Sequence, residues 1–550
     1  MISKVLSKVE RRRALICALS LSLSAVGCTP LTEYVRNGFK VGPNYERPPA
    51  PLATEWIDAK NPEVKSIPAD YSRWWTAFND PVLNDLVRIA YEQNVNLKVA
   101  ATRVLEARAQ RAIAVSTLFP QQQTAAGAFS HTQVSANIAN SPPKRFFDTW
   151  TTAFSAAWEV DFWGRFRRTI ESADDVLDSS VDDYDNVMVT LIGDVAATYV
   201  QYRVLEQQIV YTQQNVELQR GLLKIATNQW KSGQKGELPV VQSTSLLGQL
   251  LALIPLQEIG LRQANNQLCI LLGIPPTELA ARLGKAPIPE TPLEVLVGIP
   301  ADLIRRRPDL RSAERLIAAQ NAQIGVAEAD YYPAFFINGT LGYQAKDLSK
   351  LFTPQSFTGQ IGPAFQWNIL NYGRILNNVR LQDFKTQELV GVYQQKVLAA
   401  AQEVENGIIS FLNARRETND LAGSVEAARR AVKITRDQLN SGLIDFTPVF
   451  VASQFLAQDE LQYAQSRGDI ALGLIAVYRA LGGGWELRLD ETSNINDQRA
   501  SAKNQPEAMP SKESTVAVSD RPTPKEDHSL PAPKMWQPNE APAANKEDVQ

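Results

Sequence analysis

The sequence predicts an α+β membrane protein whose chain is internally duplicated. Three observations predict this fold class: the sequence matches itself at an offset of about 210 residues, two stretches of almost 70 residues contain no proline, and several short segments alternate apolar and polar side chains. A repeat of this length indicates two structural units. Long proline-free stretches favour long helices, and alternation favours strands with one apolar and one polar face.

The repeat keeps the same spacing over most of its length. Trp158, Trp163, Gly164 and Arg165 are followed 209 residues later by Trp367, Tyr372, Gly373 and Arg374, and the same offset relates Ser232, Gly233, Pro239 and Val240 to Ser441, Gly442, Pro448 and Val449. Upstream of these motifs the offset is 213, as in Phe119-Pro120 and Tyr332-Pro333. The difference indicates a loop of unequal length in two units, which we place at residues 76–290 and 291–490.

The first 27 residues have the pattern of a secretory signal peptide. Basic residues precede an apolar run from Ala14 to Val26 that is too short to span a bilayer, and no later run is long enough, so we expect no transmembrane helix. The run ends in Ala25-Val26-Gly27-Cys28, which resembles a bacterial lipobox. We therefore predict a covalent lipid on Cys28, followed by an extended segment to residue 75. A cleaved signal with a chance cysteine is the alternative.

The two units are expected to share one order of elements. An opening helix at about 81–118 or 302–330 leads to two strands, a long helix at 165–230 or 374–440, and a returning helix of about 35 residues. Asp80-Pro81 is a typical helix start. At 1.5 Å per residue the long helices would reach on the order of 100 Å, about three times the apolar thickness of a bilayer. Their many charged residues exclude lipid, so they must stand in water.

The strand segments separate apolar from polar side chains. Phe335, Ile337 and Leu341 alternate with Asn338 and Thr340, two segments at 149–160 and 357–369 alternate similarly, and a fourth at 122–133 is weakly patterned. Such strands suit a β-barrel that faces lipid outside and water inside, although a half-buried soluble sheet is the alternative. Because bacterial barrels need at least about eight strands, four strands require several chains. Aromatic residues near the strand ends are candidates for a membrane-interface belt, with a place in the core as the alternative for some of them: Trp150, Trp158, Trp163, Trp367 and Tyr372.

Other function classes find little support in the sequence. The formal net charge of -3 and the scattered basic residues give no surface for nucleic acid. Only His131 and His528 are available, and no metal, nucleotide or hydrolase motif is present, so we expect no metal and no catalysis. Cys269 is expected in the core, Arg305–Arg307 at a helix start, and residues 491–550 to be disordered.

Several motifs resemble those of the outer membrane factor family, the TolC-like channels, and within it the lipoprotein branch of multidrug efflux components. The resemblance extends to about residue 490 and is carried by the duplicated Trp/Tyr-Gly-Arg motif and by VGPNYERP (Val41 to Pro48), WWTAFNDPVLNDLV (Trp74 to Val87), RRPDL (Arg306 to Leu310) and YYP (Tyr331 to Pro333). It implies a homotrimer in the outer membrane of a Gram-negative bacterium. Four strands from each chain would form a twelve-stranded barrel, which a twelve-helix α-barrel would continue into the periplasm.

The resemblance also implies how such a protein works. It would be a passive duct of a tripartite efflux system that exports small molecules or drugs, with outer-membrane lipid around it and no cofactor besides the lipid on Cys28. A periplasmic adaptor and an inner-membrane pump, expected to be proton-driven, would open its closed end. The turns between long and returning helices would form that end, and we place adaptor docking there as a hypothesis, at Ser232, Gly233, Pro239, Val240, Ser441, Gly442, Pro448 and Val449.

One position departs from the family pattern. Family members often carry an acidic residue nine positions after the second turn's glycine, where this chain has Val451. This departure puts an acidic ring in doubt, and nearby Asp445 is better explained as an exposed turn residue. Three alternatives remain open: a periplasmic coiled-coil scaffold without a pore, a secreted or anchored enzyme, and a channel that exports proteins.

Overall fold

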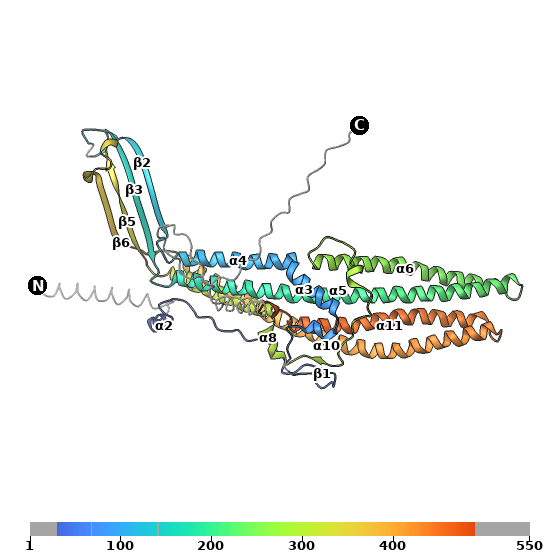
Figure 1. Cartoon of the computed structure of the whole chain (residues 1–550). Helices are drawn as coiled ribbons and strands as arrows, with labels where there is room; N and C mark the ends of the chain where they lie inside the picture. The colour runs from blue at the N-terminus through green and yellow to red at the C-terminus, as the bar shows by residue number, and fades with distance from the viewer. Residues whose placement is uncertain (1–29, 68, 140–141, 490–550) are drawn as a thin grey trace, which may run out of the picture. The chain divides into compact units, whose positions relative to one another are not determined.

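The computed structural model describes residues 30–67, 69–139 and 142–489 (Figure 1). The predicted signal peptide 1–27, the predicted lipid site Cys28 and the predicted tail 491–550 lie outside the described residues. The regular elements are α2 (Leu31–Arg36), β1 (Val64–Lys65), η1 (Trp74–Phe78), α3 (Pro81–Gln93), α4 (Val95–Ser116), β2 (Gln122–Gln133), β3 (Phe146–Val160), α5 (Arg165–Lys231), α6 (Leu238–Leu271), α7 (Ala280–Leu283), β4 (Val295–Leu296), η2 (Pro300–Asp302), α8 (Leu303–Arg306), α9 (Pro308–Ala329), β5 (Ala334–Ala345), η3 (Leu348–Lys350), η4 (Pro354–Ser356), β6 (Phe357–Gln366), α10 (Arg374–Asn440) and α11 (Phe446–Ala480).

The predicted order of elements occurs twice, but each opening helix is broken. The first break is at Asn94, whose side chain accepts a hydrogen bond from the Leu97 amide at 2.9 Å and donates one to the Leu271 carbonyl at 2.8 Å. The second is at Arg307, 213 residues later, where ψ is 117° because Pro308 disfavours a helical residue before it. The prediction of one continuous opening helix per unit was therefore wrong, and both units break at the equivalent position.

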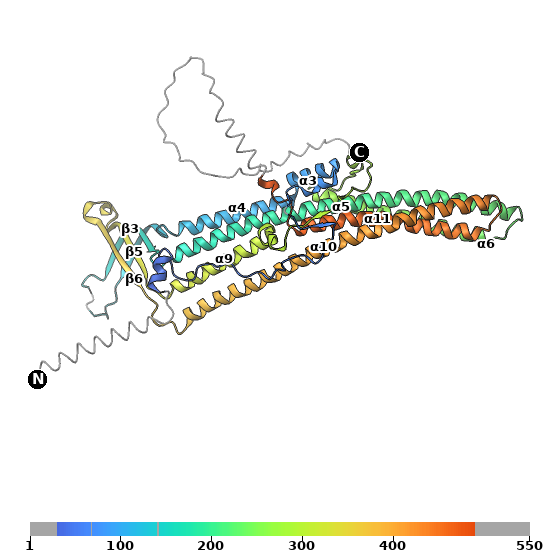
Figure 2. The ribbon, with the colours of Figure 1, turned by 90° about the horizontal axis from the view of Figure 1, so that it is seen from below.

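The long helices match their predicted bounds. Helices α5 and α10 each have 67 residues, and each begins after a glycine in the left-handed region, Gly164 at φ 80° and Gly373 at φ 81°. The returning helices α6 and α11 have 34 and 35 residues. Figure 2 shows the α5–α6 and α10–α11 hairpins side by side, with their turns at the end farthest from the strands.

One finding differs from the expectation about membrane-spanning helices. Within the described ranges, α6 is the one helix that is long and apolar enough by composition to cross a membrane. The sequence did not suggest a spanning helix here because Glu258 and Arg262 interrupt its second half. The helix lies against α5 along its length, so its composition alone does not place it in lipid.

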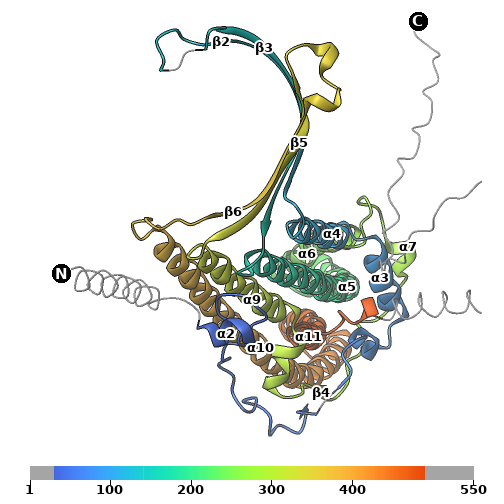
Figure 3. The ribbon, with the colours of Figure 1, turned by 90° about the vertical axis from the view of Figure 1, so that its left-hand side faces the viewer.

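The four predicted strands form one antiparallel sheet in the order β2-β3-β5-β6. Phe154 of β3 lies opposite Ala125 of β2 and Leu341 of β5, which sets the register across three strands. Figure 3 shows this sheet as a curved arc that rises from the ends of the helices. Strand β6 ends at Gln366, so Trp367 and Ile369, which alternation had included in the strand, lie beyond it.

The main core lies where α3, α5, α10 and α11 meet. The tryptophans of the WWTAF motif, Trp74 and Trp75, are 3% and 4% exposed, and Cys269 is fully buried as predicted. Asp80 caps α3 by accepting from the Val82 amide at 2.8 Å, and its other oxygen accepts from the Tyr199 hydroxyl at 2.7 Å. The predicted helix start at Asp80-Pro81 is thereby confirmed, and the cap also connects α3 to α5.

An N-terminal strap, which we define as residues 37–75, runs from α2 beside the helices toward η1 (Figure 1, dark blue). Its far end is fixed by the parallel pair β1–β4 and by Trp56, whose indole donates to the Gly298 carbonyl at 3.0 Å. Its near end passes so close to α9 that a Cβ at Gly42 would collide with the backbone of Gly325. The described part of the predicted extended segment 28–75 therefore connects both units.

Candidate functional site: the sheet and the helical tips

The two turns at the helical tips have the same construction. Gly233 at φ 72° and Gly442 at φ 75° follow the C-cap residues Ser232 and Ser441, and no heavy atom lies within 4 Å of where a Cβ would stand on either glycine. The glycines are therefore required by the left-handed backbone and not by crowding. The side chains around them are solvent-exposed, so the turns themselves are available to a partner.

The four predicted docking residues that follow the turns differ in exposure: Pro448 is exposed, Pro239 and Val240 are partly exposed, and Val449 is buried. Pro239 and Val240 lie in the first turn of α6, and Pro448 and Val449 in the first turn of α11. Val449 is fully buried in a small cluster with Leu222, Ala226, Leu439 and Phe446, and Val240 packs against that cluster. This cluster joins the two hairpins, so Val449 can support a docking surface but its side chain cannot contact a partner.

An ion pair also joins the two turns. The Lys235 ammonium donates to Oδ1 of Asp445 at 2.6 Å, and this hydrogen bond and charge hold the pKa of Asp445 below its ordinary value. Asp445 is also the N-cap residue of α11 and is exposed, as predicted, while Val451, six residues further on, is 40% exposed. The pairing with Lys235 was not foreseen, because the two residues are 210 positions apart and are not equivalent in the repeat.

The sheet has the two chemically different faces that alternation predicted. The register places Trp150, Phe154 and Trp158 of β3 on the same face as Leu341 of β5 and Phe365 of β6. The opposite face carries polar side chains, among them Ser155 and Thr340, whose hydroxyl oxygens lie 3.2 Å apart. Glu159 is on this polar face. A surface of this kind can separate lipid on one side from water on the other.

The five candidate interface aromatics differ in their surroundings. Trp158 and Trp367 donate their indole N–H groups to the carbonyls of Leu118 at 3.1 Å and Tyr331 at 2.9 Å, two acceptors that are themselves 213 positions apart. These two tryptophans therefore tie each strand pair to the end of its opening helix. The others are Trp150, which lies inside β3 and packs on Phe129 at 4.5 Å; Trp163, which stacks on Tyr332 at 4.3 Å; and Tyr372, which is 96% exposed.

A cluster of charges connects α5, α9 and the segment after α11. Asp185, which is fully buried, accepts two hydrogen bonds from Arg488 at 2.8 and 3.0 Å and one from Arg311 at 3.0 Å. Beside it, Asp182 lies 2.7 Å from Arg311, yet burial outweighs that attraction and raises the pKa of Asp182 to about 6. Among the described residues, no group of three potential ligands could hold a metal ion.

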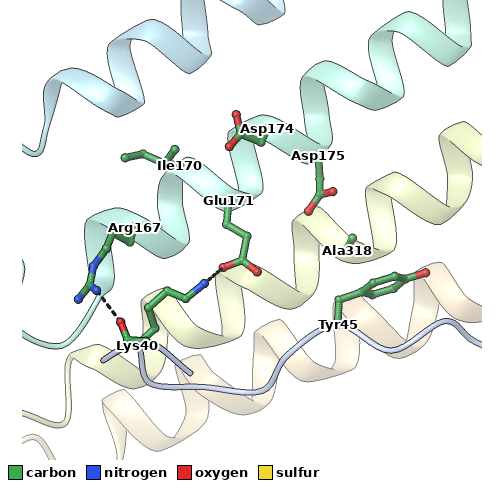
Figure 4. Close-up of a pocket in the computed structure, with 9 residues that line it drawn as sticks. Lys40, Tyr45, Arg167, Ile170, Glu171, Asp174, Asp175 and Ala318 are labelled. Atoms are coloured by element: carbon green, nitrogen blue, oxygen red, sulfur yellow. Dashed lines mark hydrogen bonds and ion pairs between the residues drawn. The ribbon is translucent and has the colours of Figure 1, made fainter. Parts of the chain in front are cut away.

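Two arginines of α5, Arg167 and Arg168, hold the N-terminal strap, and no sequence motif had singled them out. The guanidinium of Arg168 is fully buried and donates to the carbonyls of Val41 at 3.0 Å and Gly42 at 2.8 Å. Beside it lies a cleft of ≈ 570 Å³ between α5, α9 and the strap, across which Lys40 pairs with Glu171 at 2.9 Å (Figure 4). The available signal was the basic run that follows the first Trp-Gly-Arg motif and is lacking in the second.

Comparisons with known proteins agree with this architecture. A family model described as outer membrane efflux protein matches residues 86–274 and 299–483, one stretch in each unit. Nodulation protein T of Rhizobium leguminosarum bv. trifolii is 29% identical over 466 residues, which cover 83% of this chain and 97% of that protein. The pyoverdine export outer membrane protein OpmQ of Pseudomonas putida is 29% identical over 482 residues, covering 86% of this chain and 97% of that protein. The solved structure of the outer-membrane channel OprN has a TM-score of 0.76 at 28% identity and covers 81% of this chain and 99% of that one.

Proposed function

Because this chain belongs to the outer membrane efflux protein family and is the outer-membrane channel subunit of an efflux system, we propose that three copies assemble into one continuous duct. The observation that carries this proposal is the sheet. It has one apolar and one polar face, and its two edge strands, β2 and β6, lie at opposite ends of the strand order. Four strands cannot close a barrel, but the edges of neighbouring copies can pair to form one of twelve strands.

The assembly is tested by linking the sheet edges. Cysteine replaces Ala126 of β2 and, one position at a time, residues 358–364 of β6, in full-length protein that carries Cys269→Ala to remove the buried thiol. Neighbouring strands bring facing Cβ atoms to about 4.5–5.5 Å, which permits a disulfide at the correct register. We expect covalent products of two and three chains and no larger ones. If no cysteine pair links one chain to another, and the protein also shows no conductance in a planar bilayer, the proposal is contradicted.

The lipid anchor is the second part of the proposal. The chain is made with a signal peptide of residues 1–27, and Cys28 then carries a covalent lipid that includes palmitate, so the subunit is a lipoprotein. Support comes from the lipobox-like sequence and from α2, which begins three residues after Cys28. Mass spectrometry of the N-terminal peptide tests this directly. An unmodified Cys28, or cleavage at another residue, would overturn it.

The duct takes its cargo from partners. A periplasmic adaptor and an inner-membrane pump, which we propose is proton-driven, engage the tips and open them, and the system exports small molecules and contributes to multidrug resistance. Support comes from the exposed turns opposite the sheet and from relatives named for the export of pyoverdine and toluene. A photoreactive residue at Ser232 or Ser441, which are exposed and precede the two glycines, should capture the adaptor of a proton-driven pump in living cells. Capture of an adaptor from an ATP-driven protein exporter would contradict the small-molecule assignment.

A further inference from the structure

Phe39, at the start of the strap, has an unusual backbone. Its φ is 61°, in the left-handed region, which costs a residue with a side chain about 1–2 kcal/mol. The guanidinium of Arg167 stabilises this turn by donating to the carbonyls of Gly38 and Phe39, each at 2.7 Å, while its Nε donates to Asp161 at 2.9 Å. Figure 4 shows Arg167 reaching from α5 toward the strap. The fold thus stabilises a strained backbone whose phenylalanine side chain points outward.

The exposed phenylalanine belongs to a larger apolar surface at the base of the sheet. Phe39 packs edge-on against Tyr34 at 5.5 Å, Tyr34 stacks on Phe162 at 6.5 Å, and Phe162 contacts Phe335 of β5 at 5.4 Å. We name Val35, Phe39, Phe162 and Phe335 the base patch, and their exposed fractions are 53%, 53%, 50% and 37%. Aromatic rings that are this exposed are costly in water, because their apolar area remains hydrated.

The base patch continues the apolar face of the sheet. Phe335 lies opposite Val160 of β3 and Phe365 of β6, both on that face, and the Tyr34 hydroxyl donates to the Phe162 carbonyl at 2.7 Å, which fixes α2 to the end of β3. A chain of aromatic contacts through Phe335, Phe162 and Tyr34 therefore connects the sheet to α2. If the sheet faces lipid, the base patch meets the same bilayer at its edge.

The position of the predicted anchor points to the same side of the bilayer. Leu31 opens α2 three residues after Cys28, and three residues of extended chain reach roughly 10 Å. An acylated Cys28 therefore keeps α2 at the leaflet that holds the acyl chains. The border of the patch is mixed in charge, with Glu33 and Arg36 on α2 and Lys40 on the strap, which suits zwitterionic phospholipid head groups.

We propose that the base patch is a phospholipid-binding surface, embedded at the boundary between head groups and acyl chains of the periplasmic leaflet. This inference rests on the proposed function, because it assumes that the apolar face of the sheet meets lipid. It assigns Phe39 a role as a membrane-interface aromatic, which the five candidates chosen from the sequence did not include. Arg167 holds the turn that contains Phe39 through the carbonyls of Gly38 and Phe39.

The test places a photoreactive phenylalanine analogue at one position at a time in the full-length protein in living cells. Phe39 tests the inference, Ile361, which is 78% exposed on the apolar face of β6, tests the proposed membrane face, and Leu443, 75% exposed in the second tip turn, is the control far from the sheet. After illumination, mass spectrometry identifies what is covalently attached. All three side chains are more than half exposed, which leaves room for the larger analogue.

We expect glycerophospholipid adducts at positions 39 and 361 and none at 443. Lipid at position 361 with another protein, or nothing, at position 39 would overturn the inference and leave the proposed function intact. Lipid at position 443 as abundant as at position 39 would also overturn it, because capture would then be unspecific. A lack of lipid at position 361 would overturn the membrane face itself, and the inference with it.

Discussion

Asp182 is a carboxylate whose protonation in the folded protein differs from that in the unfolded chain. Burial raises its pKa from 3.8 to about 6, even though Arg311 lies 2.7 Å away and Arg315 also lowers that pKa. Between about pH 4 and pH 6 the folded state therefore binds more protons than the unfolded state. The stability contributed by protonated Asp182 is present below about pH 4 and is lost as the pH rises through 6. Asp175 on the same helix face behaves alike, with a pKa of about 6.

Asp182→Asn should remove the share of this pH dependence that belongs to Asp182. We expect the wild-type protein to lose stability relative to the variant between pH 4.5 and 6.5, on the order of 1 kcal/mol. Thermal unfolding followed by circular dichroism across this range measures it. Asp178→Asn on the same helix, where the side chain is 59% exposed, is the control. Parallel stability curves for the wild type and Asp182→Asn would show that burial of this carboxylate has no such effect.

At the scale of elements, the two units differ at the helix that contacts the strap. Arg167 and Arg168 of α5 bind strap carbonyls, whereas the positions 209 residues later in α10 are Leu376 and Asn377. There is one strap for two units, so one pair of arginines suffices. The asymmetry also explains why Gly164 and Gly42 cannot carry side chains, since Gly164 lies against the strap backbone at Lys40 and Gly42 of the strap lies against the backbone of Gly325 in α9.

Arg168→Ala should release the near end of the strap. Arg168 is fully buried, and its loss removes the guanidinium that donates to the carbonyls of Val41 and Gly42, at a cost of about 3 kcal/mol. Hydrogen exchange should then become faster in residues 38–44 but not in β1. Arg168→Lys should not restore slow exchange in residues 38–44, because an ammonium group cannot match the planar donor geometry of a guanidinium.

Arg88→Ala is the matched control for this prediction. Arg88 pairs with Asp85 and Glu92 on the exposed face of α3, so its loss should leave exchange in the strap unchanged. Equal protection of residues 38–44 in the wild type and Arg168→Ala would contradict the assignment of Arg168 as the residue that holds the strap.

Much of the element order could be predicted from the sequence, because it depends on local and periodic signals. The bounds of α5 and α10 follow from the absence of proline and the terminal glycines, and the sheet faces follow from alternation. Contacts between distant segments had no such signal. The break at Asn94 depends on a bond to the Leu271 carbonyl, the strap depends on Arg168, and the roles of Trp158 and Trp367 depend on the helix ends below them.

At the scale of the whole molecule, the tips and the sheet lie at opposite ends of helices about 100 Å long, so a change at the tips can control passage without altering the barrel. The Lys235–Asp445 pair is the polar contact between the two turns, and the cluster around Val449 is the apolar one. The apolar cluster keeps the hairpins together when the ion pair is lost. Breaking the ion pair should therefore loosen the turns without unfolding them.

In the proposed duct, Lys235→Glu should make the end that the tips form leak. The glutamate repels Asp445 at the position where the ammonium attracted it, and we expect about a two- to fivefold rise in open probability in planar bilayers, because an exposed pair is weak. Asp445→Lys should act alike, and the double exchange should restore the wild-type value by re-forming the pair in reverse.

The wild type in about 1 M salt should approach the single variants, since screening weakens exposed charges. Acidic pH should have the same effect only after falling through the lowered pKa of Asp445, where its carboxylate is protonated and the attraction disappears. If the double exchange leaks as much as either single variant, the turns are held by the apolar cluster alone, and the ion pair has no part in closing the duct.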